Sequence, residues 1–206
     1  SPDSTVAEQL QQLAIVDSVK WIWKGNLRVP AEEKWEDRFV SEDEPLHNEY
    51  GYSYKQIKML NGTKLHEAGF RGEGMRVAVI DAGFMNADRV SAFDSLRLLG
   101  THNVVFPGKS VFVGDDHGTK VLSCLAADIP GVMVGTAPKA SYLLLKSEDS
   151  DSEYPVEEDY WTAAVEYADS AGVDVISSSL GYFAFDTDEL SYDQDALAGR
   201  TAMISR

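Results

Sequence analysis

Apolar residues along the chain form short continuous runs, and stretches with helical spacing separate them. Four such runs are typical of strands that are buried on both faces of a parallel sheet. They lie at residues 75–81, 102–106, 141–147 and 173–179. The pattern predicts that these four segments are strands of one sheet.

Two stretches between these runs have the spacing of amphipathic helices. The first covers residues 118–127 and follows a histidine, and the second covers residues 156–172. In the second stretch, Trp161, Val165 and Ala168 fall on one side of the helix. Strands that alternate with helices predict a layered α/β fold with right-handed crossovers.

The first quarter of the chain has a different pattern of apolar and polar residues. Residues 4–23 have the pattern of a short amphipathic helix and then an alternating strand. A charged segment without a sustained period follows, and the alternation of strands and helices begins only near Tyr52. We therefore expect an N-terminal extension and linker at residues 1–46 and a domain at residues 47–206.

The net charge of the chain argues against one class of partner, nucleic acid. Lys and Arg number 18 against 34 Asp and Glu, which gives a net charge of −16. So acidic a surface repels phosphate backbones, so nucleic acid is not an expected partner. No apolar run is long enough for a membrane span. The single cysteine, Cys124, excludes an internal disulfide and a cysteine-based metal cluster.

Asp81 stands at the end of the first predicted strand, before a turn that contains glycine. Functional groups in open α/β sheets gather at the carboxyl ends of strands, which makes Asp81 a candidate. An aspartate at this position can also cap the turn through its own backbone. The local sequence leaves both interpretations open.

His117 lies in the segment "DDHGTKV", at the start of a predicted helix. It can be a metal ligand together with Asp115 and Asp116, a structural histidine with local partners, or a general base. The positive end of the helix dipole would keep such a base neutral. Adjacent residues seldom converge on one ion, and no other histidine stands at ligand spacing, which argues against the metal site.

Three serines, residues 177–179, follow the last predicted strand in "ISSSLGYF". An activated serine often stands on a strained turn of the form G-x-S-x-G, which this segment does not match. The local sequence favours a strand end flanked by small residues over a nucleophile.

Taken in order, four segments resemble the subtilisin-like serine proteases, the subtilase family. They match the strand that ends in the catalytic aspartate, the histidine motif, the next strand, and the strand that lines the substrate cleft. The separations from Asp81 to His117 and from His117 to Ser179 also fit the family. The matching segments are residues 54–84, 115–121, 134–149 and 172–182.

The resemblance implies a three-layer α/β fold with a mostly parallel sheet, helices on both faces and an incomplete C-terminal side. It implies a serine endopeptidase that hydrolyses peptide bonds through an acyl-enzyme. Asp81 matches the aspartate that orients the triad histidine, and His117 matches the general base. Ser179, Leu180 and Gly181 match the segment that pairs with a polypeptide substrate in extended conformation. No cofactor is implied.

The chain departs from the family pattern at three places. Ala82 stands where the family has a hydroxyl beside the aspartate, and Lys120 stands in place of a second histidine. The short segment 128–133 takes the place of the family's calcium-binding loop, so we expect no metal site.

The sequence ends at Arg206, before the family's oxyanion asparagine and its Gly-Thr-Ser nucleophile motif. We expect a complementary C-terminal half of the same protein to supply the serine, and this chain alone to be inactive. Residues 1–30 resemble the end of a subtilase pro-segment, which makes residues 1–46 a pro-segment remnant or an N-terminal extension and linker. The resemblance implies secretion or the cell envelope, with a signal peptide outside this chain.

Two other classes of function remain open. A non-catalytic, subtilase-like regulatory fragment would bind extended peptides without cutting them. A metal-dependent hydrolase would use Asp115, Asp116 and His117.

Overall fold

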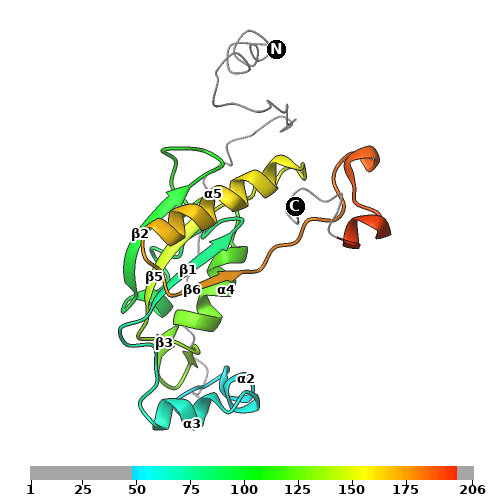
Figure 1. Cartoon of the computed structure of the whole chain (residues 1–206). Coiled ribbons are helices and arrows are strands. Elements are labelled where there is room, and N and C mark those ends of the chain that lie inside the picture. The colour runs from blue at the N-terminus through cyan, green and yellow to red at the C-terminus, as the bar shows by residue number, and fades with distance from the viewer. Residues whose placement is uncertain (1–47, 199–206) are drawn as a thin grey trace.

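The computed structural model describes residues 48–198 (Figure 1). The helix and strand expected at residues 4–23 and the pro-segment remnant lie outside the described residues. The boundary between an extension at residues 1–46 and a domain at residues 47–206 therefore stays a prediction.

A parallel sheet of four strands forms the centre of the described part, in the order β2-β5-β1-β6. β1 pairs with β5 over its whole length, so Asp81 and Lys146 lie side by side at the carboxyl edge of the sheet. The strands are β1 (Arg76–Asp81), β2 (Arg97–Asn103), β5 (Ser141–Lys146) and β6 (Val175–Ser178).

One long helix covers each face of this sheet, as Figure 1 shows: α4 (His117–Ala126) on one side and α5 (Val156–Ser170) on the other. Successive side chains of a strand point to opposite faces. Accordingly, Val77 and Val79 of β1 belong to the core under α4, whereas Ala78 and Ile80 belong to the core under α5. The three-layer α/β fold is confirmed.

The crossovers do not all have the same hand. The connection from β2 to β5 and the connection from β5 to β6 run in the same direction across the sheet. The first carries α4 over one face and the second carries α5 over the other. Their hands are therefore opposite, and the prediction of uniformly right-handed crossovers is wrong. Right-handedness follows when a twisted strand feeds directly into its helix, but a long loop (104–116) separates β2 from α4.

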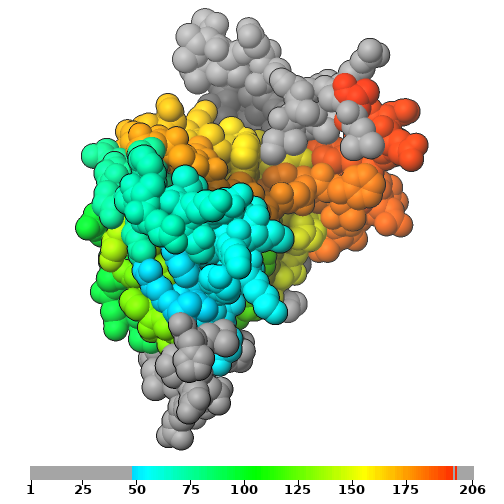
Figure 2. Space-filling model, turned by 90° about the horizontal axis from the view of Figure 1, so that it is seen from below, coloured from blue at the N-terminus to red at the C-terminus, as the bar shows by residue number. Residues whose placement is uncertain are grey.

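Smaller elements close the end of the molecule away from α5, where α2 (Tyr54–Met59) and α3 (Gly62–Glu67) lie beside a short hairpin. The hydroxyl of Ser53 donates to the carbonyl of Val134 at 2.7 Å and accepts its N–H at 3.1 Å, which ties α2 to this hairpin. In Figure 2, α2 and α3 form much of the near surface. The remaining elements are β3 (Asp128–Ile129), β4 (Met133–Val134) and the 3₁₀ turns at Ser91–Phe93, Asp188–Leu190 and Gln194–Ala198.

The strand predictions succeed at the centre of the sheet and fail at one edge. The first, third and fourth predicted strands match β1, β5 and β6 to within two residues at each end. The second was expected at 102–106, but β2 runs from Arg97 to Asn103. Its side chains are mostly exposed, so it lacks the apolar run that marks a buried strand. The buried Val105 belongs to the loop that follows.

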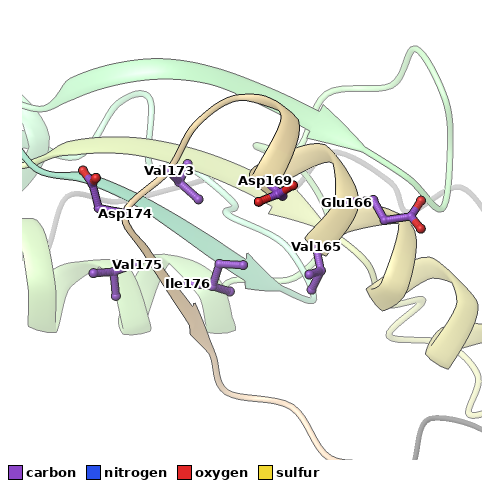
Figure 3. A pocket seen from close by; sticks show the side chains of 7 residues that line it. All are labelled: Val165, Glu166, Asp169, Val173, Asp174, Val175 and Ile176. Atoms are coloured by element: carbon purple, nitrogen blue, oxygen red, sulfur yellow. The ribbon is translucent and has the colours of Figure 1, made fainter. Parts of the chain in front are cut away.

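β6 also differs from the expectation of burial on both faces. It pairs with β1 alone among the described strands, and Val175 and Ile176 are 49% and 38% exposed. Beside it lies an open groove of about 540 Å³, which Figure 3 shows between the second half of α5 and β6. Its lining is Val165, Glu166, Asp169, Val173, Asp174, Val175 and Ile176.

Among the described residues, no helix has both the length and the hydropathy that crossing a bilayer requires.

The exposed edge of β6 predicts self-association of this chain, because an open strand edge with apolar side chains pairs with other chains. We expect Ile176→Lys to weaken this association by roughly tenfold or more in sedimentation velocity. The control is Met59→Lys, which places the same charge at an exposed apolar residue of α2. An unassociated wild-type chain, or equal effects of both substitutions, would contradict the prediction.

Candidate active site

Asp81 and His117 meet at the carboxyl edge of the sheet. The Nδ1 atom of His117 lies 2.7 Å from Oδ1 of Asp81, and this oxygen also accepts the N–H of Ala82 at 2.8 Å. Asp81 is fully buried, whereas the His117 side chain is 50% exposed. The contact expected from the sequence is thus present, and the catalytic role of the two residues remains a prediction.

Local hydrogen bonds position the start of α4, of which His117 is the first residue. The backbone N–H of His117 donates to Oδ1 of Asp115 at 2.7 Å. The carbonyl of Asp115 accepts the N–H of Met85, and the hydroxyl of Thr119 donates to the carbonyl of Met85 at 2.9 Å. The loop after β1 and the first turn of α4 are therefore joined directly.

Gly118 allows this helix to approach β1 closely. A Cβ atom at this position would lie 2.4 Å from the carbonyl oxygen of Gly83 and 2.9 Å from Cβ of Asp81. Both are backbone or near-backbone atoms, which cannot move without shifting the strand end. A side chain here would push His117 away from Asp81.

The surroundings of the pair set its protonation. Burial raises the pKa of Asp81, and the hydrogen bond with His117 opposes that rise. The Oδ2 atom of Asp81 has no hydrogen-bond partner among residues 48–198. Because Nδ1 of His117 donates to the carboxylate, Nε2 carries the lone pair and faces away from Asp81. The half-exposed imidazole can then accept a proton from a group on its outer side.

The metal interpretation of "DDHGTKV" gains no support from the geometry. Oδ1 of Asp116 forms an exposed ion pair with Lys120 at 2.7 Å, and Oδ1 of Asp115 accepts a backbone N–H. Within the described part of the chain, these residues do not bring three ligand atoms together. Lys120 therefore pairs with Asp116 and not with His117.

The expected substrate segment follows the outer strand of the sheet. Ser179 and Gly181 are exposed, and Leu180 packs against the core under α5. In the described residues no serine hydroxyl forms a hydrogen bond with His117, and the hydroxyl of Ser178 instead accepts the indole N–H of Trp161 at 2.9 Å. The use of residues 179–181 in substrate binding stays a prediction.

The structure adds a group of buried acids that the sequence reasoning missed. They follow β5 or begin α5, next to the buried ammonium group of Lys146, which donates to the carbonyl of Ala82. Burial raises the pKa of Glu148 to about 7, and burial with the nearby Glu148 carboxylate raises that of Glu157 to about 9. The dense acidic run "SEDSDSEYPVEED" directly after a buried strand was the available signal. The buried acids are Glu148, Asp149, Glu157 and Glu158.

The buried Asp81 carboxylate holds a half-exposed imidazole at the carboxyl edge of a parallel sheet. Such an arrangement is suited to acid–base chemistry on a hydroxyl or thiol nucleophile, and that role stays a prediction for this pair.

The sequence of the chain is similar to those of known serine proteases. The chain is 32% identical to subtilisin E of Bacillus subtilis (strain 168) over 147 residues, which cover 69% of the chain and 36% of subtilisin E. It is 31% identical to the major intracellular serine protease of the same strain over 133 residues, or 61% of the chain and 40% of that protein. The chain is thus subtilisin-like, as its sequence motifs indicate.

The relatives are much longer than the region over which this chain matches them. The chain spans about a third of the length of subtilisin E. The solved MycP3 protease from the type VII (ESX-3) secretion system has a TM-score of 0.48 and 24% identity, over 60% of this chain and 36% of that one. No protein-family model matches the chain.

Gly118→Ala tests the packing that positions His117. We expect a loss of about 1–3 kcal/mol in the free energy of unfolding, because the new methyl group overlaps atoms of β1 and its loop. The measurement is urea unfolding of the chain. Gly100→Ala is the control, since its methyl group would meet only Leu143 at an ordinary 3.7 Å. Equal stability of the two variants would show that the start of α4 is not tightly packed.

Glu148→Gln tests the electrostatics of the buried acids in a buffer with chelator. The raised pKa means that the unfolded state ionises above about pH 4.5 while the native state keeps its proton to about pH 7. Glu148 thus contributes a loss of about 3 kcal/mol of stability as pH rises through this window, so the stability of the glutamine variant relative to the wild type should increase by about that amount. Unfolding free energies on both sides of the window measure this, with the exposed Glu166→Gln as control. A difference between variant and wild type that is independent of pH would refute the assignment.

Proposed function

We propose that this chain carries the aspartate and histidine of a subtilisin-like serine endopeptidase. The observation that carries the proposal is the 2.7 Å contact between Nδ1 of His117 and Oδ1 of the buried Asp81. The relationship to subtilisins supports serine protease parentage. The parent protein hydrolyses peptide bonds through an acyl-enzyme.

In this mechanism Nε2 of His117 removes the proton of a serine hydroxyl as the serine attacks the scissile carbonyl. Asp81 holds the imidazole in the required tautomer and stabilises the imidazolium that forms. His117 then returns the proton to the leaving amine. We assign the serine and the oxyanion donor to a part of the protein outside this sequence, so the chain alone does not cut peptides.

The substrate is a polypeptide in extended conformation that lies along residues 179–181. The exposure of Ser179 and Gly181 next to an outer strand supports this proposal, because main-chain hydrogen bonds to a strand edge bind any extended sequence.

A complementary C-terminal half of the same protein is the proposed partner of β6. Three observations support a further strand at this side of the sheet: the edge of β6 that pairs with no described strand, the half-exposed Val175 and Ile176, and the groove in Figure 3.

We also propose that residues 1–46 are a pro-segment remnant and that the parent protein is a zymogen, secreted or in the cell envelope. The name of one relative describes an intracellular protease, so fractionation of cells that produce the parent protein is the test of location.

His117→Ala in the parent protein tests the catalytic assignment. We expect kcat/KM for peptide cleavage to fall by roughly 10⁴-fold or more with an unchanged circular dichroism spectrum, because a triad without its base loses most of its rate. The control is His102→Ala, whose ring stacks on Tyr167 with centroids 4.5 Å apart. Retained cleavage by the His117 variant would end the assignment.

The exposed segment after β6 also fits a second function, a regulatory fragment that binds extended peptides without cutting them. The reading frame beyond Arg206 distinguishes the two, because only a protease encodes a Gly-Thr-Ser motif there.

A further inference from the structure

Three glutamates converge beside the carboxyl end of β5. One carboxylate oxygen from each of Glu148, Glu153 and Glu157 lies within 4.8 Å of the other two. Two oxygens that bind one Ca²⁺ at about 2.4 Å can be at most about 4.8 Å apart. The three side chains are therefore close enough to share one ion.

Glu157 supplies an observation that does not depend on this spacing. Its side chain is only 2% exposed, and Oε1 accepts the N–H of Asp149 at 2.9 Å. Oε2 is buried and, when Glu157 and Glu153 are both ionised, has no hydrogen-bond partner in the described part of the chain, because only a shared proton could join the two carboxylates. A buried carboxylate oxygen without a partner is costly, and such atoms mark places where an ion or a water completes a site.

The charges nearby do not balance this group. Lys146 is the cation that acts on Glu148 and Glu157, and its ammonium group already donates to the carbonyl of Ala82. If all three glutamates were ionised together, one lysine would leave an excess of negative charge, and burial with mutual repulsion accordingly raises the pKa of Glu148 and Glu157. A divalent cation would remove most of that excess.

The shape of the cluster favours Ca²⁺. All candidate ligands are carboxylate oxygens, which hard cations prefer, and Ca²⁺ tolerates irregular geometry whereas Mg²⁺ demands a near-ideal octahedron. Glu153 is exposed and opens the cluster to solvent. The phenol of Tyr182 donates to Oε1 of Glu148 and holds that side chain in place.

We propose that Glu148, Glu153 and Glu157 form a Ca²⁺ site that ties the loop after β5 to the first turn of α5. This Ca²⁺ site departs from the sequence-based expectation that the chain has no metal site. It lies beside the Asp81–His117 pair and does not depend on protease activity. Because Tyr182 contacts Glu148, bound Ca²⁺ also steadies the segment that follows Gly181.

Calcium titration of the full 206-residue chain tests the proposal, by calorimetry and by luminescence of Tb³⁺ as a substitute ion. We expect saturable binding at one site and a higher midpoint of thermal unfolding with Ca²⁺. Glu153→Gln and Glu157→Gln should each weaken binding roughly tenfold or more, because each removes one charged ligand. The control Glu166→Gln removes the same charge from an exposed position on α5 and should change affinity less than about twofold.

Two results would overturn the proposal. One is the absence of saturable Ca²⁺ binding by the wild-type chain. The other is equal weakening in all three variants, which would indicate diffuse attraction to a chain with a net charge of −16. Glu153 decides the matter if Glu157→Gln fails to fold, because its side chain is exposed and circular dichroism can verify that its variant is native. Equal competition by Mg²⁺ would contradict the assignment to Ca²⁺.

Discussion

The close approach of the first turn of α4 to the carboxyl end of β1 is the constraint on which the site depends. Gly118 lies so near to Asp81 and Gly83 that no side chain fits between them. This packing places His117 against a fully buried carboxylate, while the other edge of the imidazole stays in solvent. A functional pair of this kind requires the strand and the helix to be fixed relative to each other to within a fraction of an ångström.

The sheet provides that rigidity unevenly. β1 and β5 are paired along their whole length and covered by a helix on each face, so the strand that ends in Asp81 is the best supported part of the fold. β6 pairs with β1 at one edge and with no described strand at the other, and its side chains are largely exposed. The segment after β6 is therefore the place where an extended chain can add to the sheet with the least rearrangement.

Buried carboxyl groups gather at the same carboxyl edge and are accommodated in two different ways. Asp81 gives one oxygen to the imidazole of His117 and to a backbone N–H. The acids after β5 have one buried lysine, a tyrosine hydroxyl and a backbone N–H among their partners, and burial raises the pKa of Glu148 and Glu157. The first arrangement suits proton transfer, and the second suits a bound cation.

The sequence by itself determined the central strands, both long helices and the pairing of Asp81 with His117. Continuous apolar runs and helical spacing are local signals from which the strands and helices can be predicted. The family motifs identify Asp81 and His117 as the residues that meet at the site. Only the tertiary structure decided the position of β2, the opposite hands of two crossovers and the convergence of Glu148, Glu153 and Glu157. An outer strand such as β2 is mostly exposed, so its sequence needs no continuous run of apolar residues by which the strand could be predicted. The handedness of a crossover and the convergence of carboxylates depend on how distant segments pack. A local run of residues gives no information on that packing.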